Sequence, residues 1–176
     1  MILYGPIVQS TSIGEIMDSR MKRYLGVAAA LLVGFAVAAQ AKSWEDDFEK
    51  ASAEAKQSGK YMLVDFSGSD WCGWCIKLDK EVFSRKEFKV FAEDNLVLVL
   101  LDFPRQKPQS KKLAKQNDAL QKKYGIKGFP TVLILDPSGQ LVETTGYQAG
   151  GAEPYVEMLK KIIEEHKAST AKAGGE

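Results

Sequence analysis

The 176-residue chain has few side chains that bind metals through sulfur or nitrogen: two cysteines and one histidine. These three cannot supply the four ligands of the usual zinc site, so we expect no metal. The chain also lacks an excess of one charge, because 24 basic and 23 acidic residues leave a formal net charge of +1. That balance gives no reason to expect a nucleic-acid partner. There is no internal repeat.

The composition itself is that of a globular protein, with 45% apolar and 27% charged residues. The length suits one domain and is short for two. The first 41 residues differ in kind from the rest.

A stretch that begins at Met21, MKRYLGVAAALLVGFAVAAQAK, has the three parts of a secretory signal peptide. A basic start at residues 22–23 precedes an apolar run over residues 24–39, and the segment ends Ala-Gln-Ala. The run is shorter than the ~20 residues of a membrane span. We predict that residues 21–41 are cleaved and that the protein is periplasmic or otherwise exported. An uncleaved N-terminal anchor is the alternative.

Residues 1–20 fit no part of this signal, and we interpret them as a spurious or unstructured extension before the true start at Met21. After cleavage we expect no stable membrane insertion. The remaining chain can bury roughly two-thirds of its unfolded surface, which suffices for one core. We assign residues 42–167 to the folded domain and residues 168–176 to a flexible tail.

Helices and strands alternate along this domain. Apolar runs of strand length at residues 61–66, 96–103 and 131–136 suit strands that are covered on both faces. The turn signal Asp-Pro-Ser-Gly then leads to a fourth strand, residues 140–147, in an antiparallel hairpin. The order α–β–α–β–α–β–β–α predicts parallel pairing before that hairpin. The expected fold is α/β, a three-layer α/β/α sandwich with a mixed sheet of about four strands.

Several helix ends carry cap signals. Ser43 with Asp46 is expected to start a helix that ends near Ser58, and Ser84 opens a capping box for a helix to about residue 94. Ser110 is expected to cap a helix that Gly125 closes. The last helix is expected to begin near residue 154 and to end at residue 167.

Both cysteines lie in SGSDWCGWCIK, residues 67–77, and could form a structural disulfide, half of a metal site or a redox pair. A disulfide that closes so short a loop constrains the unfolded chain by only ~2 kcal/mol. A c-type haem site would need histidine where Ile76 stands. Cys72 follows a strand and begins a helix, where the helix start stabilises a thiolate and the first thiol's pKa commonly falls to ~3.5–7.5. We therefore predict a redox pair in which Cys75 attacks a mixed disulfide on Cys72.

The stretches VDFSGSDWCGWC and YGIKGFPTVLILDPSGQ resemble the thioredoxin superfamily over about residues 42–167. Within it, GSDWC-x-WCIK, with DFP and GG further on, is most similar to the periplasmic DsbH-type thioredoxin-like proteins. The resemblance implies a thioredoxin-like fold with an extra N-terminal helix. It also implies a thiol–disulfide oxidoreductase that acts on protein disulfides, receives electrons from a membrane donor and needs no cofactor beyond its own disulfide.

The resemblance further implies roles for single residues. Cys72 matches the nucleophile and Cys75 the resolving thiol. Pro130 matches the family's cis-proline, which leaves a backbone edge free for substrate, and Phe129 precedes it where the family contacts substrate. Asp65 matches the buried acid that helps proton transfer at the resolving cysteine, although it stands one position further from Cys72 than in thioredoxin.

The residues around the cysteines are expected at the surface that binds substrate. Trp71 and Trp74 flank an expected exposed thiol and form an apolar platform with Gly73 between them, unless both rings merely pack against the helix start. Asp70 is expected to cap the active-site helix. His166 on the last helix is expected at the surface.

The leading hypothesis is an exported enzyme that reduces or isomerises protein disulfides. A disulfide-forming oxidase is one alternative, because Trp74 stands where thioredoxin has proline and the reduction potential cannot be carried over. A non-catalytic thioredoxin-like module that binds unfolded or partner polypeptides is the other. Residues 105–127 carry eight basic residues and one acidic residue, which we interpret as a solvated helix face or a docking surface for an acidic partner.

Overall fold

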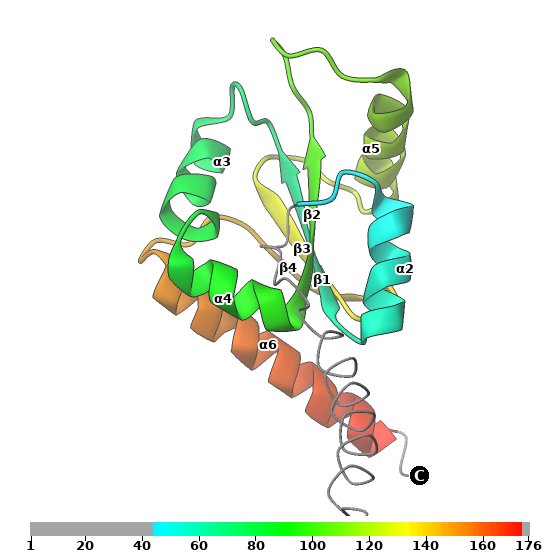
Figure 1. Ribbon diagram of the computed structural model, residues 1–176, viewed down its shortest axis with the longest axis vertical. Coiled ribbons are helices and arrows are strands. Elements are labelled where there is room, and N and C mark those ends of the chain that lie inside the picture. Colours follow the sequence, from blue (N-terminus) through cyan, green and yellow to red (C-terminus); the bar gives the residue numbers. More distant parts are fainter. Residues whose placement is uncertain (1–43, 174–176) are drawn as a thin grey trace, which may run out of the picture. The chain divides into compact units, whose positions relative to one another are not determined.

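The computed structural model describes residues 44–173, so the predicted extension, signal peptide and cleavage site lie outside the described residues. Four strands form one sheet in the order β2-β1-β3-β4 (Figure 1). Their bounds are β1, Tyr61–Ser67; β2, Leu96–Asp102; β3, Thr131–Leu135; and β4, Leu141–Thr145. The mixed four-stranded sheet that the sequence predicted is confirmed.

Helices cover both faces of the sheet. Figure 1 shows α2 and α5 on one face and α3, α4 and α6 on the other, which confirms the α/β/α layers. A π-helical turn, η1, follows α3 directly and continues the helix that the sequence predicted to start at the cysteines. The bounds are α2, Phe48–Ser58; α3, Gly73–Leu78; η1, Asp79–Phe83; α4, Lys86–Asn95; α5, Lys111–Lys123; and α6, Ala152–Ala173.

Two apolar cores lie on opposite faces of the sheet. Alternate side chains of a strand point to opposite faces, so an apolar run fills both cores. In β1, Leu63 packs with α3, α4 and α6, whereas Val64 packs with α2 and α5. Each of these two side chains is fully buried. The next residue, Asp65, follows the alternation and faces the same layer as Leu63 and α3.

The predicted direction of β3 is wrong. β1 and β2 are parallel as expected, but β3 runs antiparallel to β1, with Thr131 opposite Phe66. The segment between α5 and β3 returns the chain to the end of the sheet where β1 stops. β3 must therefore run in the reverse direction, and this brings Pro130 to the edge of the sheet that carries the cysteines.

Two of the predicted caps are also wrong. Asp47, rather than Ser43 or Asp46, caps α2 through the amide of Lys50. Ser84 is the C-cap of η1, and its hydroxyl donates to Asp79, so α4, whose N-cap is Arg85, begins without a side-chain cap. The cap at Ser110 is confirmed, because its hydroxyl accepts the amide of Leu113.

The last helix is longer than predicted. α6 continues beyond residue 167 to Ala173, because no helix-breaking residue occurs before the glycines at 174–175. His166, expected at the surface, is half-buried, and its Nδ1 lies 2.9 Å from the hydroxyl of Tyr61. At the other end, Glu45 pairs with the outer edge of β2, which covers part of an edge that other chains would otherwise be able to join.

Candidate active site

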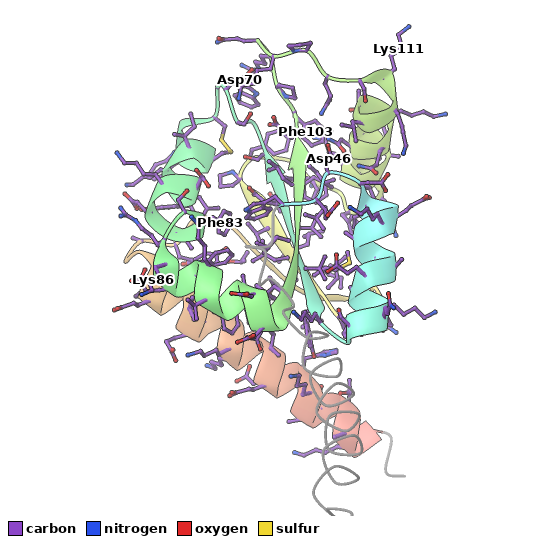
Figure 2. The ribbon with its side chains drawn as sticks, viewed as in Figure 1. Asp46, Asp70, Phe83, Lys86, Phe103 and Lys111 are labelled. Carbon is purple, nitrogen blue, oxygen red and sulfur yellow. A yellow bond between two sulfur atoms is a disulfide. The ribbon has the colours of Figure 1, made fainter. Side chains whose placement is uncertain are left out.

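The two cysteines form a disulfide where β1 gives way to α3; Figure 2 shows it as a yellow bond near the start of that helix. Cys72 is the N-cap of α3, and its Sγ accepts the backbone amide of Cys75 at 3.2 Å. Cys72 is 6% exposed and Cys75 3%, so the expected exposed thiol is nearly buried. The bond to Cys75 and the amide contact hold the sulfur of Cys72 against the helix end.

Trp71 is half-buried, and its ring contacts residues from two other segments of the chain. Its Nε1 donates to the carbonyl of Phe103 at 2.7 Å, and the Arg105 guanidinium lies 3.7 Å from the ring centre. The ring of Phe129 meets it edge-on at 5.9 Å. A side chain at Gly68 would meet the indole within 2.5 Å, so glycine is required there. Trp71 therefore braces the cysteine loop against the loop that follows β2.

Asp70 was expected to cap α3, but it does not. Its carboxylate instead accepts the backbone amides of Arg105, Gln106 and Lys107 at 2.8–3.0 Å. The helix N-cap position is occupied by Cys72, two residues further on, which leaves Asp70 facing the neighbouring loop. The amide of Arg105, followed by those of the next two residues, holds the pKa of Asp70 below its usual value.

Trp74 has the opposite environment, because 58% of its surface is exposed. Its ring lies 5.2 Å from that of Tyr147, which follows β4. The ammonium of Lys77 lies about 5 Å from both ring centres, and the hydroxyl of Tyr147 donates to Glu81 at 2.7 Å. Two aromatic rings from distant parts of the chain thus form one surface beside the disulfide.

The residues before β3 complete the rim of the site. The Phe129–Pro130 peptide bond is cis, and the ring of Phe129 stacks on Phe103 at 5.0 Å. Gly146 lies so close to the backbone of Pro130 that a Cβ there would stand 3.1 Å from the proline oxygen. The segment 146–147 therefore runs directly beside Pro130.

Asp65 lies behind the disulfide, in a cavity of about 320 Å³ that Cys75 also lines. Trp44, Ser67 and Asp79 contribute to the same walls. Asp65 is 4% exposed, and its Oδ1 has no hydrogen-bond partner among the described residues. An unpaired buried carboxyl oxygen is costly unless the group is neutral.

Burial raises the pKa of Asp65 to about 8, and the charges of Asp79 and Asp102 add to the effect. Tyr155 on α6 has a pKa raised by its own burial and by Asp65, and its buried hydroxyl also has no partner among residues 44–173. Asp65, which lines the same cavity as Cys75, is therefore mostly protonated at neutral pH.

The site residues predicted from the sequence lie together in the structure. Around the disulfide the structure brings together the braced Trp71, the exposed Gly73 and Trp74, the rim residues Phe129 and Pro130, and Asp65 behind Cys75. Sequence reasoning missed Tyr147, Lys77, Glu81 and the Asp70 contacts. The predicted hairpin offered a signal for Tyr147, because the end of β4 must lie beside the start of β3.

Comparisons with known proteins agree with this geometry. Residues 48–163 match the family described as Thioredoxin-like domain. The chain belongs to that family. It is 34% identical to the disulfide bond reductase DsbH of Chlamydia pneumoniae over 127 residues, which cover 72% of this chain and 76% of the relative. A solved structure of a DsbH oxidoreductase superposes with a TM-score of 0.67 at 33% identity, covering 74% of this chain and 90% of the other.

This thioredoxin-like chain is a thiol–disulfide oxidoreductase of the DsbH type. Other relatives are longer: the thioredoxin-related protein DsbJ of C. pneumoniae is 35% identical over 92 residues, which are 52% of this chain but 26% of DsbJ.

Within residues 44–173, no cluster of three or more histidine, cysteine or acidic residues is arranged to hold a metal. The same part of the chain contains no helix long and apolar enough to cross a membrane.

Proposed function

We propose that the protein is exported and reduces protein disulfides, using the Cys72–Cys75 pair of its Cys-Gly-Trp-Cys motif. The observation that carries this is the sulfur of Cys72 at the first turn of α3, where it accepts the amide of Cys75. An amide donor and the helix dipole favour the thiolate, which is the attacking form. The similarity to a protein named disulfide bond reductase favours reduction over oxidation.

The proposed reaction starts from the reduced dithiol. The Cys72 thiolate attacks one sulfur of a substrate disulfide, so a mixed disulfide forms and the first substrate thiolate leaves. Cys75 then loses its proton and attacks the sulfur of Cys72, which releases the second substrate thiolate. Two electrons have passed to the substrate, and the enzyme holds the disulfide seen here.

Asp65, in its ionised form, is proposed to take the proton of Cys75 and to end protonated beside the new disulfide. The two residues line one cavity, and the raised pKa of Asp65 brings it close to that of an ordinary thiol. Proton transfer is most effective between groups of similar pKa. Oxidised and reduced enzyme would then differ in the protonation of Asp65 as well as in the disulfide.

Substrate is proposed to bind at the exposed rim. Trp74 and Tyr147 offer an apolar surface, Gly73 leaves room beside the sulfurs, and the backbone at Phe129 and Pro130 is placed to meet an extended chain. Trp71, committed to contacts within the protein, shapes this site by positioning its loop. An aromatic surface of this kind suits unfolded polypeptides with apolar side chains.

A membrane dithiol protein is proposed to return the two electrons. Proteins named thiol:disulfide interchange protein DsbD are among the relatives, at 31% identity over 110 residues for that of Pseudoalteromonas atlantica. Such a donor must reduce the Cys72–Cys75 disulfide by the same exchange in reverse. Export is proposed from the predicted signal peptide at residues 21–41, and N-terminal sequencing of the secreted protein is expected to begin near Lys42.

An insulin-reduction assay tests the mechanism. We expect Cys72→Ser to abolish turnover, whereas Cys75→Ser should accumulate a mixed disulfide with substrate that mass spectrometry detects. Full activity of Cys72→Ser would refute the mechanism. Peptide binding that persists in a cysteine-free variant, with negligible reductase activity in the parent protein, would favour the binding-module alternative.

A redox titration against glutathione tests the direction of electron flow. A potential near that of thioredoxin, about −270 mV, fits a reductase. A potential near −120 mV, the value for the oxidant DsbA, would favour the disulfide-forming alternative.

A further inference from the structure

Charge is unevenly distributed along this nearly neutral chain. Residues 105–127 hold eight basic residues and one acidic residue, Asp118. Of the chain's 24 basic and 23 acidic residues, the remainder therefore holds 16 and 22. The positive excess is confined to the loop after β2, to α5 and to the residues just after it.

Seven of these eight cations have no acidic partner within ion-pair distance among residues 44–173. Four of the seven are here called the basic rim: Arg105, Lys107, Lys111 and Lys115 are all exposed, and none is within ion-pair distance of a carboxylate among the described residues. Lys112 differs, because it pairs with Asp47 at 3.0 Å and is left out of the rim. The rim therefore presents positive charge that no ion pair within the described domain neutralises.

The basic rim starts at the disulfide loop. The guanidinium of Arg105 covers Trp71, which precedes Cys72, and the ammonium of Lys107 lies 3.4 Å from the hydroxyl of Ser69. Figure 2 shows Lys111, at the start of α5, at the same end of the domain as Asp70 and away from Lys86. Arg105 and Lys107 therefore lie beside the loop that carries the cysteines, and Lys111 and Lys115 extend the rim along α5.

Asp70 lies close to the basic rim, but its carboxylate forms no ion pair with the cations of the rim. Both of its oxygens are occupied by the backbone amides of residues 105–107. Asp102, the other nearby acid, is likewise engaged by the amide and hydroxyl of Ser69. Neither carboxylate is within ion-pair distance of the four cationic side chains, although the backbone amide of Arg105 and, more weakly, the charge of Lys107 lower the pKa of Asp70.

We infer that the basic rim docks acidic segments of substrate polypeptides and so favours disulfides whose cysteines are flanked by aspartate or glutamate. This inference rests on the proposed reductase function and adds a substrate preference to it. Polypeptide is the favoured polyanion because the rim adjoins a disulfide that exchanges with cysteines. Complementary charge beside a reactive site raises the association rate and selects among partners.

Three matched disulfide peptides test the preference, identical except for glutamate, glutamine or lysine on either side of one cysteine. With the reduced, exported protein at low salt, the second-order rate constant should be about tenfold higher for the glutamate peptide than for the lysine peptide. At about 1 M salt, where the Debye length is ~3 Å, the two should converge. Equal rates at low salt would overturn the inference.

Charge-neutralising variants locate the effect. Lys111→Gln with Lys115→Gln removes two rim charges without touching Trp71, and it should slow the glutamate peptide several-fold while leaving the glutamine peptide unchanged. Lys86→Gln with Lys89→Gln removes the same charge from α4, which covers the other face of the sheet. A loss of preference in both double variants would assign the effect to net charge and overturn the rim.

Two further readouts separate this inference from the proposed function. Versions of the peptides with serine in place of cysteine report docking alone, through tryptophan fluorescence. Reduction of neutral 2-hydroxyethyl disulfide reports the chemistry alone. If the three serine peptides bind equally, the inference that the rim docks acidic segments is overturned, even if the neutral disulfide is reduced. If the glutamate peptide binds more tightly and this preference is lost in salt, the inference is supported, even if no disulfide is reduced. Rim-dependent binding to anionic phospholipid vesicles, with no peptide preference, would overturn the inference in favour of a membrane.

Discussion

The carboxylate of Asp70 accepts the backbone amide of Arg105 at 3.0 Å, across 35 positions of sequence. The side chain of the same arginine lies on Trp71, the neighbour of Asp70. These two contacts, one to the backbone and one to the side chain, fix the loop after β2 against the loop that carries the cysteines. The position of the disulfide therefore depends on a segment that contains neither cysteine.

Loss of the Asp70 carboxylate should loosen that connection. In Asp70→Asn we expect a lower Tm and faster hydrogen exchange at the amides of residues 105–107. Because those amides hold the pKa of Asp70 below its usual value, its contribution is fully present above about pH 4 and is lost as pH falls through the lowered pKa. Asp46→Asn is the control, since Asp46 is exposed and its carboxylate accepts no hydrogen bond within residues 44–173. Identical exchange in the two variants would contradict the connection.

Replacement of Asp65 should stabilise the protein in a pH-dependent way. The pKa of Asp65 is about 8 in the folded protein and about 4 when unfolded, so folding becomes less favourable as pH rises between these values. Asp65→Asn should therefore raise the free energy of unfolding by about 4 kcal/mol at pH 7 and by little at pH 4. Urea unfolding across this range measures the difference. A constant offset between the two proteins would show that Asp65 does not titrate there.

The same variant should slow the second half of the reaction. Without an acceptor for the proton of Cys75, mixed disulfide should accumulate, and its resolution should fall by about 10²-fold near neutral pH. Quenched-flow trapping of the mixed disulfide measures this step apart from the first attack. Asp118→Asn, on the exposed side of α5, is the matched control. An unchanged resolution rate would exclude Asp65 from the proton transfer.

Tyr147 should affect protein substrates more than small ones. In Tyr147→Ala the ring beside Trp74 is lost, and KM for a peptide disulfide should rise about 2- to 10-fold, the value of one aromatic contact, with kcat little changed. Tyr147→Phe keeps the ring and loses only the hydrogen bond to Glu81, so its KM should lie between the two. Val90→Ala, a distant exposed apolar site, is the control. A parallel rise in KM for 2-hydroxyethyl disulfide would contradict a role in polypeptide binding.

A side chain at Gly146 is expected to disturb the backbone of Pro130. In Gly146→Ala the new methyl group would stand 3.1 Å from the backbone oxygen of Pro130, so this backbone must shift slightly. A misplacement of about 1 Å can cost about 10²-fold, so we expect this smaller shift to lower kcat/KM by less than that. Gly128→Ala is the comparison, since a Cβ there meets no atom within 4 Å. Normal insulin reduction by Gly146→Ala would show that the contact is not needed for function.

The local sequence predicted the layers, the strands and the position of the cysteines well. Apolar runs such as residues 61–66 need cover on both faces whatever the topology, and a strand followed by a Cys-x-x-Cys stretch places the first sulfur at a helix start. The antiparallel β3 was missed because strand direction depends on where a connecting segment ends, which no local pattern encodes. The roles expected of Asp70 and Ser84 failed for a related reason. A short polar side chain can cap its own helix or bond elsewhere, and only its neighbours in space decide between them.

By itself, the sequence determined that two sulfurs lie one helical turn apart at the end of a buried strand, because spacing and hydrophobic pattern fix local structure. The folded chain decided what surrounds them. Asp65 came to share a cavity with Cys75, Tyr147 came to lie beside Trp74, and Arg105 came to cover Trp71. Those contacts join residues far apart in the chain, so they depend on where the fold brings each element and not on any local pattern.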